Sequence, residues 1–98
     1  MSSKQYFIYI ATNKTNTVLY TGVTNNLIRR GFEHRNKSGS KFAAKYNVIK
    51  LVYDEVYTDI IEALNREKQI KAGSRKKKLE LIQRFNPTFR DLWDEILK

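Results

Sequence analysis

The chain has 98 residues, enough for one domain, and carries nineteen lysines and arginines against ten acidic residues. The resulting net charge of +9 favours a polyanionic partner such as nucleic acid over a merely soluble basic protein. The absence of cysteine excludes disulfides, thiolate nucleophiles and zinc–sulfur sites. No apolar stretch is long enough for a signal peptide or a bilayer span, so we expect a cytoplasmic protein.

The beginning of the chain predicts a β-hairpin. Aromatic and β-branched residues predict one strand at positions 6–12 and a second at positions 18–23. The residues between them, at 13–16, are typical of a turn. A hairpin centred between Lys14 and Thr15 places Tyr9 directly opposite Tyr20. The two rings would then share one face of the sheet, because directly opposed side chains lie on the same face.

A helix is expected next, over residues 27–35. Three preceding residues are each suitable N-caps: Thr24, Asn25 and Asn26. Leu27, Gly31 and His34 fall along one side of this helix, with Arg30 beside them. Because Arg30 and His34 are four residues apart, they are neighbours on the helix surface.

The rest of the chain predicts one more strand and several helices. The expected elements are a polar loop at 36–40, a short helix at 41–46, a strand at 48–57, and helices at 59–72, 75–85 and 88–97. Gly73 suits the position directly after the helix at 59–72, and the pair Asn86-Pro87 ends the helix at 75–85. Apart from the short helix, the order is β-β-α-β-α-α-α, a mixed α+β fold without repeats or linkers.

Glu67 is a charged residue on the mainly apolar face of the helix at 59–72. The other positions of that face are 60, 63, 64, 70 and 71. Burying a carboxylate is costly unless it is paired or binds a metal. Two interpretations follow, an ion pair with a neighbouring base (Arg66, Lys68 or Lys71) or a ligand for Mg²⁺, which keeps several waters and needs few protein ligands.

Arg30 and His34 each have a functional and a structural interpretation. The planar guanidinium of Arg30 suits a phosphate, although Arg29 has the same chemistry and either can be an exposed solubilising residue. His34, the only histidine, is either a general base, with an ordinary pKa near 6.5, or a hydrogen-bonding residue near a helix end.

The two tyrosines and the lysine run also have more than one interpretation. Tyr9 and Tyr20 are sheet-face aromatics, stacking platforms for a base, or catalytic groups; catalysis requires a pKa below the ordinary value of about 10, which nearby cations favour. Lys76, Lys77 and Lys78 form the densest charge cluster with Arg75, and are either a DNA-backbone patch or a solvated face.

The order and spacing of these residues resemble the GIY-YIG nuclease family, in particular its small free-standing bacterial members. The segments that carry the resemblance are Phe7-Ile8-Tyr9, Leu19-Tyr20-Thr21-Gly22, 27–34, 63–71 and 85–93. Phe7 stands where the family has its first glycine, and Thr21 stands for an isoleucine. Both departures leave the tyrosines, the arginine and the glutamate in place.

The resemblance implies a small three-stranded antiparallel sheet flanked by helices, in a single domain over residues 1–98. It implies an endonuclease that hydrolyses DNA phosphodiester bonds with structure-directed or weakly sequence-specific cleavage. The expected partner is branched, damaged or duplex DNA, with a protein partner for targeting and without a membrane or a small-molecule cofactor. The alternatives are a nucleic-acid-binding module with the same fold and little turnover, and a protein-interaction domain that uses residues 89–93.

The resemblance also implies residue roles. Glu67 would hold a single Mg²⁺ or Mn²⁺ at the scissile phosphate, and Arg30 would stabilise the charge that develops there. Tyr9 would be the general base and Tyr20 its positioning partner, or the reverse. His34 would orient a tyrosine or contact phosphate.

Further residues are expected to bind substrate around this centre. Asn86 matches a late asparagine of the family near the site, while Arg29 and the lysines at 76–78 would contact the nucleic acid.

Overall fold

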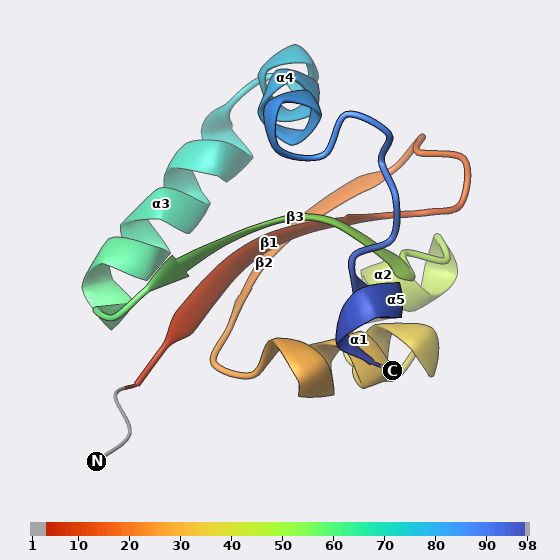
Figure 1. Ribbon diagram of the computed structural model, residues 1–98, viewed down its shortest axis with the longest axis horizontal. Helices are drawn as coiled ribbons and strands as arrows, with labels where there is room; N and C mark the ends of the chain where they lie inside the picture. The colour runs from red at the N-terminus through yellow and green to blue at the C-terminus, as the bar shows by residue number, and fades with distance from the viewer. Residues whose placement is uncertain (1–3, 98) are drawn as a thin grey trace.

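The computed structural model, which describes residues 4–97, shows a three-stranded antiparallel sheet with helices on both faces (Figure 1). The elements are β1 (Tyr6–Thr12), β2 (Leu19–Thr24), α1 (Leu27–Arg35), α2 (Lys41–Lys45), β3 (Lys50–Tyr57), α3 (Ile60–Ala72), α4 (Arg75–Phe85) and α5 (Trp93–Ile96). The strand order β2-β1-β3 places the most apolar strand, β1, in the middle of the sheet. The predicted fold class is therefore confirmed. Of the expected domain 1–98, residues 1–3 and 98 lie outside the described residues.

The sheet separates two apolar layers, because successive side chains of a strand point to opposite faces. On one face, Tyr9 and Ala11 of β1 pack with Trp93 and with residues of α1 and α2; we call it the α1 face. On the other, Ile8 and Ile10 pack with α3 and α4; we call it the α3 face. Figure 1 shows α3 and α4 on one side of the sheet and α1, α2 and α5 on the other.

The register of the β1–β2 hairpin differs from the predicted one. Tyr9 pairs with Gly22, and Tyr20 pairs with Ala11, so the prediction that the tyrosines are directly opposite is wrong. The loop is longer than predicted because the side-chain oxygen of Asn13 accepts hydrogen bonds from two backbone N–H groups further along it. A shift of two residues keeps every side chain on its face. The two rings therefore still share the α1 face, with centroids 6.1 Å apart.

Local capping residues place the helix ends. α1 and α4 begin and end where the sequence predicts, capped by Asn26 and Ser74, whose side chains accept from the N–H groups of Arg29 and Lys77. Gly73 follows α3 as expected, but its φ of −73° is not the left-handed conformation that favours glycine. In the part of the chain that the structure describes, no helix has the length and apolar character needed to cross a bilayer.

The predicted last helix, 88–97, is wrong over its first half. Only the short α5 is helical, and Phe89, inside the predicted helix, has a φ of 54°. Two polar side chains hold this segment against β3: Asn86 donates to a β3 carbonyl, and Asp91 accepts from a β3 N–H. These tertiary hydrogen bonds outweigh the helical pattern of the sequence, whose contribution is a weak preference.

Candidate functional site

A buried tyrosine–histidine pair links β1 to α1. Tyr9 is 1% exposed and His34 is 3% exposed. The Tyr9 hydroxyl lies 3.1 Å from His34 Nε2, and His34 Nδ1 lies 2.7 Å from the carbonyl oxygen of Val48. Because a carbonyl only accepts, Nδ1 carries the proton and donates to Val48, so Nε2 of the neutral ring accepts from the Tyr9 hydroxyl. The fold thus fixes the direction in which the Tyr9 proton points.

Burial controls the protonation of both groups. Burial, and then the neighbouring Tyr20, raise the pKa of Tyr9, whereas Arg30 acts in the opposite direction. Burial lowers the pKa of His34, against the hydrogen bond to Val48, which raises it. Near pH 7, Tyr9 therefore keeps its hydroxyl proton and the His34 ring is uncharged. The lowered pKa that a tyrosine base requires is not found at Tyr9 in this structure, because burial outweighs Arg30.

Tyr20 is the more accessible of the two tyrosines. Its ring is half-buried and lies against both members of the buried pair, with centroids 6.1 Å from Tyr9 and 5.4 Å from His34. Tyr20 lies on the edge strand β2 and is half-buried, whereas Tyr9 lies on the central strand and is 1% exposed. Of the two tyrosines, Tyr20 is the one that water and substrate reach more readily.

Two glycines, which we did not assign to the site from the sequence, make room for its rings. A Cβ at Gly22 would lie 2.6 Å from both Cζ and Oη of Tyr9, and a Cβ at Gly31 would lie 2.8 Å from the Trp93 indole. Trp93 in turn lies 5.1 Å from the His34 ring, centroid to centroid. The available signal was the position of both glycines inside the segments that resemble the family.

Arg30 lies at the edge of the same cluster. Its charge lowers the pKa of both Tyr9 and His34, and its Nη1 atom lies 3.3 Å from Oε1 of Glu33. The Arg30 Nε atom is buried and has no hydrogen-bond partner among residues 4–97. Together with Arg29, Arg30 lines a groove of about 270 Å³ at the end of β2. The Arg30 side chain, which is 23% exposed, thus adds its positive charge to that of Arg29 in this groove.

Glu67 lies on α3, on the other face of the sheet from the tyrosines. Arg66 reaches β3 through a bidentate ion pair with Glu55, with N–O distances of 2.9 Å. Glu67 lies two helical turns after Ile60, which lines the groove of Arg29 and Arg30, so Glu67 is on the same side of α3 as that groove. Its side chain is 15% exposed, and its carboxylate is 3.3 Å from Lys71 Nζ. The structure thus brings Tyr9, Tyr20, Arg30 and His34 together, and places Glu67 on a helix that packs against the opposite face of the sheet.

The surroundings of Glu67 fit a hydrated divalent cation. Within residues 4–97, no three His, Asp or Glu side chains cluster into a metal cage. Mg²⁺ does not need one, because it usually binds through one or two carboxylates, waters and substrate phosphates. Among the residues that the structure describes, the largely buried side chain of Glu67 has one ion-pair partner, the exposed Lys71, which a cation can displace. Glu67 is therefore the residue that would hold Mg²⁺ or Mn²⁺.

Asn86 lies away from the tyrosines, at the end of α4. It is buried, and its Nδ2 donates to the carbonyls of Val52 and Arg90, at 3.2 and 2.8 Å, while its Oδ1 accepts from the Arg90 N–H. All of these bonds go to the backbone and hold the segment after α4 against β3. This arrangement gives Asn86 a structural role in the described conformation.

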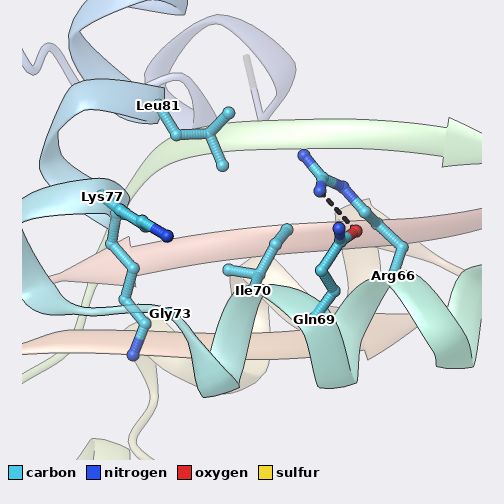
Figure 2. A pocket seen from close by; sticks show the side chains of 7 residues that line it. Arg66, Gln69, Ile70, Gly73, Lys77 and Leu81 are labelled. Atoms are coloured by element: carbon cyan, nitrogen blue, oxygen red, sulfur yellow. Dashed lines mark hydrogen bonds between the residues drawn. The ribbon is translucent and has the colours of Figure 1, made fainter.

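The lysine run at the start of α4 divides between two surfaces. Lys77 and Lys78 line a groove of about 250 Å³ between α3 and α4, whose other lining residues include no acid. Figure 2 shows Lys77 on the α4 side and Arg66, hydrogen-bonded to Gln69, on the α3 side. Lys76 instead lies on a separate surface that it shares with Glu80. The groove is thus the more cationic of the two surfaces.

Relatives of this chain give these residues a context. The sequence matches the family model of the GIY-YIG catalytic domain over residues 5–80. It is 40% identical over 78 residues to a UPF0213 protein of Staphylococcus saprophyticus, covering 80% of this chain and 94% of the relative. It is 42% identical over 76 residues to a UPF0213 protein of Clostridium perfringens, covering 78% and 81%. The solution NMR structure of a UPF0213 protein from Bacillus halodurans is similar at a TM-score of 0.52 and 29% identity, covering 81% of this chain and 83% of that one.

Proposed function

This chain belongs to the GIY-YIG catalytic domain family, and from that premise we propose that it is a metal-dependent endonuclease that hydrolyses DNA phosphodiester bonds. The observation that carries the proposal is the hydrogen-bonded Tyr9–His34 pair, with Tyr20 and Arg30 beside it. A purely structural cluster has no use for an arginine whose buried Nε is without a protein partner among the described residues. The Arg30 side chain as a whole is 23% exposed and lines the groove at the end of β2, where a phosphate can pair with its positive charge.

Arg30 binds the scissile phosphate in this proposal. Its planar fork donates two parallel hydrogen bonds and stays charged throughout the reaction. A preorganised donor of this kind stabilises the charge that develops in the transition state, and removing one such donor typically costs about 10²–10³ in rate. Arg29, which lines the same groove, adds a second positive charge for the neighbouring backbone.

In this proposal Tyr20 contacts the attacking water and Tyr9 is its positioning partner, which is the second of the two role assignments that the resemblance implies. Tyr9 is too buried to meet the attacking water, whereas the half-buried Tyr20 faces it. Tyr20 therefore orients the attacking water, and the buried Tyr9, fixed by its hydrogen bond to Nε2 of the neutral His34, positions the Tyr20 ring beside it.

Glu67 holds the divalent cation in this proposal. When bound, Mg²⁺ or Mn²⁺ would polarise the phosphoryl oxygen and stabilise the leaving oxygen. Glu67 lies on the same side of α3 as Ile60, which lines the groove of Arg29 and Arg30, and this supports a site shared between Glu67 and that groove.

A cleavage screen tests the proposed function. The purified protein is incubated with branched, nicked and duplex DNA in the presence of Mg²⁺ or Mn²⁺, and separately with EDTA. We expect a metal-dependent product on at least one substrate. The Arg30→Ala variant should lose it, whereas Arg84→Ala, which removes an exposed arginine of α4, should retain it. A folded wild-type protein that binds but cuts none of these substrates would favour the alternative, a nucleic-acid-binding module without turnover.

The groove between α3 and α4 predicts a difference between adjacent lysines. Lys77→Ala should weaken duplex binding and reduce the slope of log affinity against log salt by about 1, because one phosphate contact is lost. Lys76→Ala removes the same charge one residue away, outside the groove, and should leave the slope nearly unchanged. Fluorescence anisotropy at several salt concentrations measures both. Equal effects would show that α4 binds through its net charge and not through the groove.

A further inference from the structure

Three neighbouring aromatic rings, one stacked pair and one tilted pair, lead from the tyrosine cluster to the surface, and we call this row the stack. Tyr20 and Phe42 are stacked with centroids 6.0 Å apart and an angle of 29° between their planes. Phe42 and Tyr46 follow at 4.8 Å and 49°. Phe42 lies on α2 and Tyr46 directly after it, at the four-residue spacing that makes helix neighbours. The short α2 thus extends the row of rings outward from β2.

The outer two rings of this stack are exposed to solvent. Phe42 is 46% exposed and Tyr46 is 40% exposed. Single exposed apolar residues are common on protein surfaces, but aligned rings leave a continuous apolar surface in water. An aromatic surface of this kind favours a flat partner with its own π-face.

The charges around the stack indicate what that partner is. Residues 36–50 contain four lysines and no acidic residue. Lys41 and Lys45 are exposed on α2, and Lys45 Nζ lies 5.3 Å from the centroid of the Tyr46 ring. Rings interleaved with cations match a nucleic-acid strand, whose bases stack while its phosphates pair with the lysines.

We propose that Phe42 and Tyr46 form a stacking platform for unpaired bases, with Lys41 and Lys45 holding the adjoining phosphates. Bases inside a duplex already stack on one another, so only a single strand, a flap or a loop can offer its base faces to the platform. Building on the proposed nuclease function, the stack leads such a strand to Tyr20. The substrate class is then DNA with unpaired bases next to the cleavage site.

Metal-free binding tests the platform independently of catalysis. A fluorescein-labelled thymidine 15-mer is compared, by anisotropy in EDTA, with a strand of the same length whose central nucleotides are abasic and whose phosphates are unchanged. We expect Phe42→Ala to weaken binding of the base-bearing strand about 10-fold and to leave the abasic strand unaffected. Phe42→Tyr should restore binding. The matched control is Phe85→Ala, which removes an equally exposed phenylalanine (51%) from α4 and should change neither affinity.

The outcomes separate this proposal from the proposed function. If Phe42→Ala, shown to be folded by its thermal transition, changes neither strand or weakens both equally, the platform is wrong, whatever the protein cleaves. If the base-dependent binding is found but the wild-type protein cleaves nothing, the platform stands and the nuclease assignment fails.

Discussion

Replacing Glu67 with alanine is expected to abolish metal-dependent cleavage and to leave the fold intact. A cation held at the scissile phosphate contributes several kcal/mol of transition-state stabilisation. Since each 1.4 kcal/mol is tenfold in rate, its loss corresponds to about 10³-fold or more. The stability cost should be small, because the one observed partner of Glu67 is Lys71, four residues along α3, and such helix pairs contribute about 0.3–0.5 kcal/mol. Single-turnover cleavage rates and urea unfolding measure the two effects.

Two further variants separate the metal interpretation from the ion-pair interpretation of Glu67. Lys71→Ala removes the same ion pair but keeps the carboxylate, so it should retain cleavage. Glu62→Ala removes an exposed carboxylate from the first turn of α3 and should also retain it. Mn²⁺ should raise the thermal midpoint of the wild type and of Lys71→Ala, but not of Glu67→Ala, because a ligand that binds the native state stabilises it. If Lys71→Ala loses as much activity as Glu67→Ala, the ion pair and not the cation explains the glutamate.

Trp93→Ala should have the largest effect on stability, about 3–5 kcal/mol. The side chain is fully buried on the α1 face, its ring packs against Tyr9 and His34, and its Nε1 donates to the carbonyl of Leu27 at 3.2 Å. Removing it opens a cavity directly behind the tyrosine–histidine pair. Urea unfolding followed by far-UV circular dichroism measures the loss.

A conservative variant divides the contribution of Trp93 into packing and hydrogen bonding. Trp93→Phe keeps an aromatic ring but leaves the carbonyl of Leu27 without its indole donor, and should cost about 1–3 kcal/mol. A loss below about 1 kcal/mol for Trp93→Ala would contradict the packing that ties the C-terminal segment to α1.

Local signals in the sequence were sufficient for much of the fold. Ser74 and Asn26 cap the N-termini of their helices through bonds that span three residues, so α4 and α1 begin where a local reading places them. The face shared by Tyr9 and Tyr20 was also predictable, because alternation along a strand survives a register error of two residues. The family resemblance likewise depends only on residue types in order, which the sequence contains directly.

The two failed predictions have different causes. The hairpin register follows from the Asn13 side chain, whose hydrogen bonds stay within the loop and reach Thr17 and Val18. Residues 86–92 leave the helical pattern because Asn86 and Asp91 bond to β3, and these bonds between distant segments have no signature in a local window of sequence. Propensity is a weak preference that a few tertiary hydrogen bonds outweigh.

By itself, the sequence determined the residue types of the candidate site, their order and the elements that carry them. Only the tertiary structure decided how deep each one lies and which way it faces. It buried Tyr9 on the central strand and left Tyr20 nearer to water, and it directed Lys77 into a groove that Lys76 does not reach. The physical reason is that burial and direction arise where sheet faces, helices and loops from distant parts of the chain meet, and no single segment contains that information.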